Sequence, residues 1–160
     1  MNENEIGTEI VDCAVRLHQA LGPGLLETVY EVTLARQLEK RGLRVLRQVS
    51  IPIEYDGAKF DEGFRADIIV EDKVLVELKS VEKVNPAHKK QLLTYLRLTG
   101  MKLGYLLNFG EALMKDGITR TINGKLEPDL RASVPLREKI GIEPVSGNHP
   151  FPSGDSHATK

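Results

Sequence analysis

Apolar and polar side chains alternate along Phe64–Val70 and again along Val74–Lys79, as they do in half-buried strands. The two segments therefore predict a β-ribbon, and a three-residue turn at 71–73 would pair Val70 with Val74. In that register one face of the ribbon is wholly apolar and consists of Ala66, Ile68, Val70, Val74, Val76 and Leu78. A two-residue turn would shift the register by one residue and mix the two faces. The hydrophobic pattern therefore favours the three-residue turn.

The same register brings two carboxylates together on the other face of the ribbon. Asp67 lies directly opposite Glu77, and Lys79 projects from the same face. Like charges in direct opposition destabilise a ribbon, so a cation is expected between them. A divalent metal with Lys79 beside it meets that need. A surface ladder of Asp, Glu and Lys on an exposed sheet accounts equally well for the spacing D-x9-E-x-K taken alone.

The rest of the chain shows both helical and strand patterns. Apolar residues at helical spacing predict helices over residues 6–21, 25–41 and 86–99, each followed by a glycine stop. Mostly apolar extended segments predict further strands over residues 43–55, 102–109 and 116–122. Pro52 favours an edge or an end for the first of these strands. The order helix, helix, strand, strand, strand, helix, strand, strand predicts an α/β fold with helices flanking a mixed sheet.

Composition limits the class of protein further. With 160 residues, 41% hydrophobic and 28% charged, the chain is expected to form one soluble domain over residues 1–141. Residues 142–160 are rich in Pro, Gly, Ser and His and are predicted to be a disordered tail. No apolar run is long enough to cross a membrane. An acidic N-terminus without signal-peptide features and a single cysteine, Cys13, favour a cytoplasmic location.

The charge pattern gives only weak information about partners. A net charge of −1 exerts no global attraction on nucleic acid. Two local groups of basic residues could line a phosphate backbone, and for the first of them a solvated surface is the favoured interpretation. The first group consists of Arg36, Lys40, Arg41, Arg44 and Arg47, and the second of Lys83, Lys89, Lys90 and Arg97.

Two further motifs flank the predicted ribbon. Gly24, Glu27 and Tyr30 form G-x-x-E-x-x-Y at a helix start, and Glu27 heads an apolar stripe expected to face the sheet. Glu27 either compensates the helix dipole or supplies a third carboxylate to the same metal. Gln91 and Tyr95 share one face of the third helix. Gln91 is placed to orient a phosphate or a carboxylate, and Tyr95 fits that role or core packing.

Together these residues resemble the PD-(D/E)XK nuclease superfamily and, within it, the GxxExxY protein family, over roughly residues 6–122. The first motif matches the GxxExxY signature. The nuclease signature is complete at Asp67, Glu77 and Lys79, with Ala66 where the superfamily name has proline. Gln91 and Tyr95 match the Q-x-x-x-Y motif of RecB-type exonucleases. The resemblance implies a restriction-endonuclease-like core with a mixed sheet of four to five strands.

The resemblance also implies a division of roles within the site. Mg²⁺ or Mn²⁺ would be bound by Glu27, Asp67, Glu77 and the main-chain carbonyl of Leu78, and Lys79 would be the catalytic lysine. The predicted substrate-binding residues are Tyr30, Gln91 and Tyr95. The leading hypothesis is a metal-dependent nuclease that hydrolyses phosphodiester bonds of DNA or RNA. The alternative is a catalytically silent module that binds nucleic acid or protein. The small size favours a homo-oligomer or a protein partner in either case.

Overall fold

The computed structural model describes residues 1–128, so the predicted tail at 142–160 lies outside the described residues. Every predicted helix and strand is present within the described part. The elements are α1 (Glu3–Leu21), α2 (Glu27–Lys40), β1 (Val45–Tyr55), β2 (Ala58–Val70), β3 (Val74–Lys79), α3 (Pro86–Thr99), β4 (Leu103–Asn108), a short 3-10 helix η1 (Met114–Gly117) and β5 (Ile118–Ile122). The predicted order of helices and strands is therefore confirmed.

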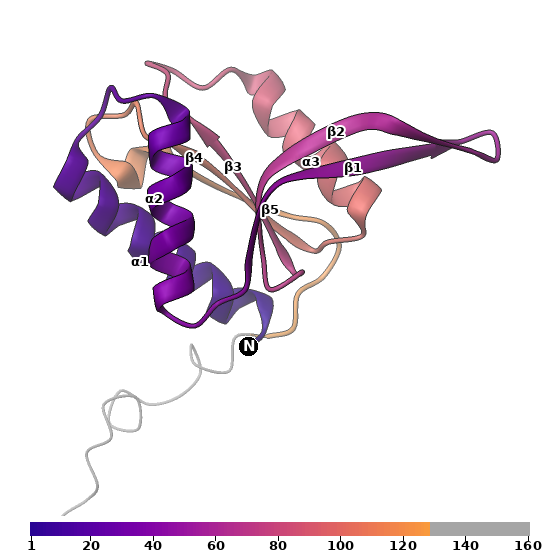
Figure 1. The fold of residues 1–160 in the computed structure, drawn as a ribbon, viewed down its shortest axis with the longest axis horizontal. Coiled ribbons are helices and arrows are strands. Elements are labelled where there is room, and N and C mark those ends of the chain that lie inside the picture. Colours follow the sequence, from indigo (N-terminus) through magenta and orange to yellow (C-terminus); the bar gives the residue numbers. More distant parts are fainter. Residues whose placement is uncertain (129–160) are drawn as a thin grey trace, which may run out of the picture. The chain divides into compact units, whose positions relative to one another are not determined.

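The five strands form one mixed sheet in the order β1-β2-β3-β4-β5. Only β3 and β4 are parallel, and the other neighbours are antiparallel. A parallel pair needs a crossover connection, and α3 supplies it. The helices α1 and α2 cover one face of the sheet and α3 covers the other (Figure 1). The prediction of a mixed sheet flanked by helices is confirmed, with Pro52 in an edge strand.

Each face of the sheet has its own hydrophobic cluster. The larger cluster joins α1 and α2 to the sheet through fully buried residues such as Ile10 and Leu34. The smaller cluster joins α3 to the sheet through Leu92 and Leu96. The helix in each case buries its apolar stripe, as the i, i+3, i+4 spacing predicts. No helix within residues 1–128 is both long enough and apolar enough to span a membrane.

The helix ends follow their capping residues. Asn85 caps α3 by accepting a hydrogen bond from the Ala87 amide, and Gly100 ends the helix in the left-handed conformation. The first helix begins at Glu3, earlier than the predicted Ile6. The reason is a capping box, in which the Asn2 side chain and the Glu5 side chain each bond the other residue's backbone N–H. This polar start is not visible in the apolar stripe.

The predicted register of the β2–β3 ribbon is confirmed. Val70 pairs with Val74, and pairing continues to Ile68 and Val76. The assignment of Ala66 to the same face as Ile68 was wrong, because Ala66 packs in the smaller cluster on the α3 side. The alternation breaks between them. Pairing of β2 with β3 stops at Ile68, and pairing with β1 omits Asp67.

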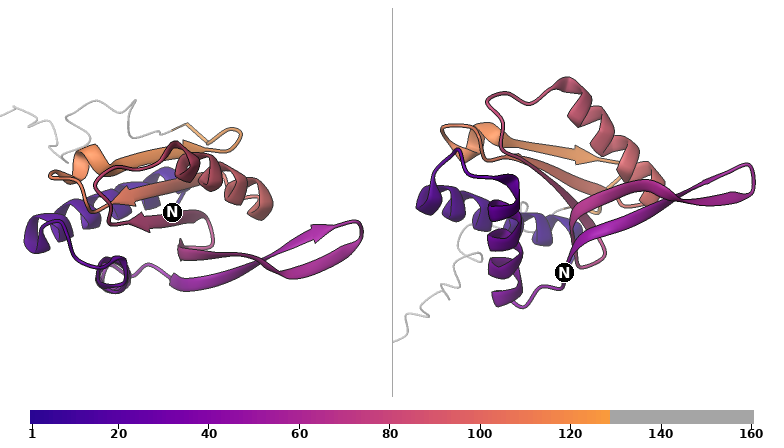
Figure 2. Two further views of the ribbon diagram at one scale, coloured as in Figure 1. Left: turned by 90° about the horizontal axis from the view of Figure 1, so that it is seen from above. Right: turned by 45° about the horizontal axis from the view of Figure 1, so that its top comes forward.

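The outer parts of β1 and β2 form a hairpin that extends away from the helices (Figure 2). The predicted strand starting at Phe64 begins earlier, at Ala58. A register shift between Ile51 and Ile53 bends the hairpin. Gly63 lies opposite this shift, where an added Cβ would stand 2.2 Å from the Ile51 carbonyl oxygen. The hairpin therefore needs glycine at this position.

Candidate active site

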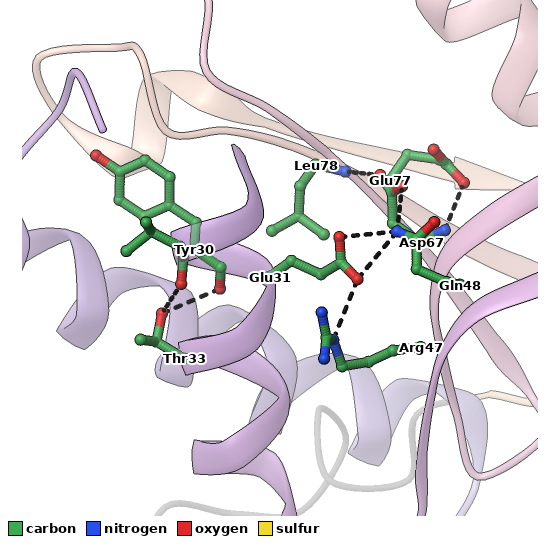
Figure 3. Close-up of polar contacts among 9 residues, drawn as sticks. Tyr30, Glu31, Thr33, Arg47, Gln48, Asp67, Glu77 and Leu78 are labelled. Carbon is green, nitrogen blue, oxygen red and sulfur yellow. Dashed lines mark hydrogen bonds and ion pairs between the residues drawn. The ribbon is translucent and has the colours of Figure 1, made fainter. Parts of the chain in front are cut away.

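Asp67 and Glu77 meet where β2 and β3 separate. The Asp67 carboxylate accepts a hydrogen bond from the Leu78 amide, with 2.9 Å between Oδ2 and N. The Asp67 amide donates to Glu77 Oε1 at 3.3 Å. At this point, carboxylate groups therefore accept the amide hydrogen bonds that main-chain carbonyls accept in a regular β-ladder. The predicted juxtaposition of the two carboxylates is present (Figure 3).

The environment of Glu77 opposes its ionisation. Burial, and next the negative charge of Asp67, raise the pKa of Glu77 to about 9. The positive charge of Lys79 acts in the opposite direction and lowers the Glu77 pKa. Lys79 is half-buried, and its main chain pairs with that of Asn108 in β4. Both other residues of the D-x9-E-x-K pattern therefore act electrostatically on Glu77.

The third helix contributes one residue directly to this electrostatic environment. Tyr95 is half-buried, and its ring stacks on Phe64 of β2 with centroids 3.6 Å apart. Burial, and then the charges of Glu77 and Asp67, raise the Tyr95 pKa. Gln91 lies one helical turn before Tyr95 and is exposed. His88, one turn earlier again, has an Nδ1 atom that is buried without a hydrogen-bond partner among the described residues.

Glu27 does not join the two carboxylates. It is the first residue of α2 and is exposed, and no three Asp, Glu, His or Cys side chains within residues 1–128 are grouped to hold one metal ion. The predicted three-carboxylate cluster is therefore not formed. Side chains of a helix lean toward its N-terminus. Tyr30 consequently occupies the inner face of this first turn, and Glu27 is left outside.

Tyr30 is a core residue and not part of an accessible surface. Its side chain is fully buried and stacks on Phe109 with ring centroids 4.3 Å apart. The hydroxyl donates to the Gly22 carbonyl at 2.5 Å and accepts from the Leu25 amide at 3.1 Å. These bonds close the loop between α1 and α2. The predicted contact of Tyr30 with substrate does not agree with this placement.

Glu31 is the acidic residue of α2 that approaches the site, and it belongs to none of the sequence motifs. Only 6% of Glu31 is exposed. Its carboxylate accepts hydrogen bonds from Gln48 and Arg47 of β1, and the same Gln48 amide reaches Asp67 (Figure 3). A sequence signal exists, because a charged residue among the buried positions Leu34 and Ala35 should have a partner.

The two groups of basic residues differ in their pairing. Three members of the first group bind acids: Arg41 binds Glu9 and Asp12, Arg44 binds Asp72, and Arg47 binds Glu31. The favoured interpretation of a structural surface agrees with this pairing. The second group forms no ion pair within the described part of the chain. Its members Lys83, Lys89, Lys90 and Arg97 are exposed on α3 and the loop before it.

Comparison with protein families identifies the class that this fold and site define. Residues 4–121 match the family model described as PD-(D/E)XK nuclease superfamily. The match covers well over half of the chain, and the chain therefore belongs to this superfamily. No curated protein and no solved structure matches the sequence.

Proposed function

We propose that this protein is a metal-dependent nuclease that hydrolyses phosphodiester bonds of nucleic acid. The observation that carries the proposal is the contact of Asp67 with Glu77 at the point where β2 and β3 separate, with Lys79 two residues after Glu77 on β3 and its charge acting on Glu77. Membership of the nuclease superfamily supports the same reading. The complete motif at Gly24, Glu27 and Tyr30 supports placement in the GxxExxY family.

The residues present fit a hard divalent cation. Carboxylate and carbonyl oxygens are the preferred ligands of Mg²⁺ and Mn²⁺, and Asp67, Glu77 and the main-chain carbonyl of Leu78 would supply them. The raised pKa of Glu77 marks a pair of acids that cannot both ionise easily without a cation. A bound divalent ion would supply Lewis acidity, which polarises a phosphoryl oxygen and makes water a stronger nucleophile at neutral pH.

The remaining residues would act on the substrate. The Lys79 ammonium would stabilise negative charge that develops on the phosphate, or orient the attacking water. Tyr95, held by its stack on Phe64, places a hydroxyl near the carboxylate pair. The exposed basic residues of α3 and its preceding loop would contact backbone phosphates, and Gln91 lies on the same helix.

The decisive experiment measures cleavage of labelled single- and double-stranded DNA and RNA with Mg²⁺, Mn²⁺ or a chelator. Wild-type protein is expected to cleave at least one substrate only with metal. Lys79→Ala should reduce the rate by orders of magnitude and still bind metal. Lys125→Ala is the matched control, because Lys125 is exposed on the loop after β5, and it should retain the wild-type rate. Metal-independent cleavage, or equal rates for Lys79→Ala and wild type, would contradict the proposal.

Metal binding is tested separately by thermal unfolding. A ligand that binds only the folded state stabilises it by about 2.7 kcal/mol at a hundredfold excess over Kd. Millimolar Mg²⁺ or Mn²⁺ should therefore raise the melting temperature of wild type. Asp67→Asn and Glu77→Gln should remove this rise, and Glu27→Gln should not.

One observation favours a second candidate, a module on the same fold that binds nucleic acid without hydrolysing it. Glu27 is exposed, so the site has two converging carboxylates where the resemblance implied three. Binding of labelled DNA or RNA by wild type, with no metal-induced thermal shift and no cleavage, would establish this second function.

A further inference from the structure

Gln48 has an unusual backbone conformation for its position. Four non-glycine residues of the described part have positive φ, and three of them lie in turns: Asp56, Glu71 and Asp72. Gln48 is the fourth, with φ 49°, and it lies within β1. Its side chain is exposed, so packing does not impose the conformation. Backbone strain of this kind persists where surrounding contacts fix it, and it concentrates at functional sites.

The amide of Gln48 contacts two acids, and the β1–β2 pairing skips Gln48 and Asp67. Its Nε2 atom lies 3.0 and 2.9 Å from the two carboxylate oxygens of Glu31, and 3.5 Å from Oδ1 of Asp67. A glutamine amide nitrogen carries two hydrogens, so one can serve each acid. Since Oδ2 of Asp67 accepts from the Leu78 amide, both oxygens of this carboxylate have a donor (Figure 3).

Glu31 is in turn held by Arg47, whose side chain is partly exposed at the protein surface. Its carboxylate is nearly fully buried and accepts from the Arg47 guanidinium, with 3.1 Å from Nε to Oε1. A buried carboxylate is stable only where such partners compensate its lost hydration. The contacts thus run from Arg47 to Glu31, from Glu31 to Gln48, and from Gln48 to Asp67. They connect α2 and β1 with the carboxylate on β2.

We propose that Glu31 and Gln48 are positioning residues: Glu31 orients the Gln48 amide, and that amide holds the Asp67 carboxylate toward Glu77. The inference rests on the proposed function, because it concerns how this chain prepares Asp67 to bind a divalent cation. The left-handed backbone of Gln48 delivers the amide to a point that a regular strand residue would not reach. Neither residue contacts the reacting atoms.

The first test separates the amide from the backbone strain. Glycine adopts positive φ without strain, so Gln48→Gly removes the side chain and relieves the backbone. Isothermal titration calorimetry with Mn²⁺ should show affinity reduced 10- to 100-fold, the effect typical of residues that support metal ligands. The melting temperature without metal should be equal or higher. Asp56→Gly, at a positive φ in the distant hairpin turn, is the matched control and should keep wild-type affinity. Wild-type Mn²⁺ affinity in Gln48→Gly would overturn the proposal.

The second test compares two acids one turn apart on α2. Glu31→Gln should weaken Mn²⁺ binding by a factor similar to that of Gln48→Gly, and the double variant should be no weaker than either single one, because both act through one contact. Glu27→Gln should bind Mn²⁺ as wild type does. If Glu31→Gln abolished binding as Asp67→Asn does, and Gln48→Gly had no effect, Glu31 would be a direct ligand and the proposal would fail.

A metal-free measurement separates this inference from the proposed function. In a chelator, the NMR signals of the Gln48 side-chain amide should shift in Asp67→Asn and in Glu31→Gln, but not in Glu27→Gln. If these shifts occur and wild type binds no Mn²⁺, the positioning contact stands and the metal-dependent nuclease does not. If wild type binds Mn²⁺ and the Gln48 signals are unaffected by both substitutions, the positioning role alone is overturned.

Discussion

The strand β2 passes through two environments, and Asp67 lies at the boundary. From Ile68 to Val70 the strand is buried and pairs in register with both β1 and β3. From Ala58 to Glu62 it is exposed and pairs only with β1, in the hairpin that extends from the sheet. The buried half belongs to the core of the sheet, and the exposed half lies outside that core. Asp67 lies at the junction between these two parts of the strand and is half-buried.

The junction also explains why the site lies here. A ladder that continued past Ile68 would satisfy the Leu78 amide with a main-chain carbonyl. Because pairing with β3 ends at Ile68, the Leu78 amide is available to Asp67. Preorganised sites are built most securely on rigid elements. The end of pairing between the two strands therefore leaves a main-chain donor on a rigid sheet for the Asp67 carboxylate.

The largest effect on stability is expected in the buried half. Ile68→Ala removes a fully buried side chain from the larger cluster and should lower the free energy of unfolding by about 2–5 kcal/mol. Urea denaturation followed by circular dichroism measures the change. A loss below about 1 kcal/mol would show that this half of β2 does not anchor the fold.

The junction itself should make stability depend on pH in the metal-free protein. The pKa of Glu77 is raised from its ordinary value of 4.5 to about 9, so between these values the folded state retains a proton that the unfolded state releases. Stability should therefore fall as pH rises through this window, by at most about 1.4 kcal/mol per pH unit for one proton. Urea denaturation in a chelator at pH 5 to 8.5 measures the slope.

Glu77→Gln is the control for this pH dependence, because glutamine does not titrate. The slope attributable to Glu77 is the difference between wild type and Glu77→Gln over the same pH range. Saturating Mn²⁺ should also flatten the slope of wild type, since a bound cation favours the ionised carboxylate. Identical pH profiles for the two proteins without metal would show that Glu77 ionises normally.

The contrast between the two halves of β2 also shows what the sequence was able to predict. The alternation from Ile68 to Leu78 has a period of two, so it determined the register from Val70 and Val74 to Ile68 and Val76. The same register placed Asp67 close to Glu77, and the two residues are in contact. Nothing in the sequence marks the positive φ of Gln48 or the end of pairing at Ile68. The face of Ala66 was therefore assigned wrongly. Strain and strand separation arise from tertiary contacts, not from local preference.

The helix α2 shows the same limit. The stripe of Tyr30, Leu34 and Leu38 was correctly predicted to face the core, and all three are fully buried. The stripe indicated the face of α2 on which Glu27 lies. It did not show whether the sheet extends far enough to cover Glu27. Glu31, beside Tyr30, received no role because the GxxExxY motif ends one residue earlier. The available signal was the presence of a charged residue among apolar positions of the helix, because such a residue needs a partner when it is buried.

Tyr30→Phe tests the structural role of the motif tyrosine with a smaller expected effect. The variant loses the bonds to the Gly22 carbonyl and the Leu25 amide and should lower the free energy of unfolding by about 1 kcal/mol. Its stack on Phe109 remains. Mn²⁺ affinity and any cleavage rate measured at a temperature well below unfolding should match those of wild type. A selective rise in KM for nucleic acid would instead return Tyr30 to the substrate site.

The smallest effect is expected in the exposed half of β2. Phe60 is 47% exposed in the hairpin, so its replacement removes little buried apolar surface. Phe60→Ala is therefore expected to change the free energy of unfolding by no more than about 0.5 kcal/mol, against the several expected for Ile68→Ala on the same strand. Both variants shorten an apolar side chain, so urea denaturation under identical conditions compares the two environments directly. Equal losses for the two variants would mean that the hairpin is held as firmly as the core, and that Asp67 does not lie at a boundary.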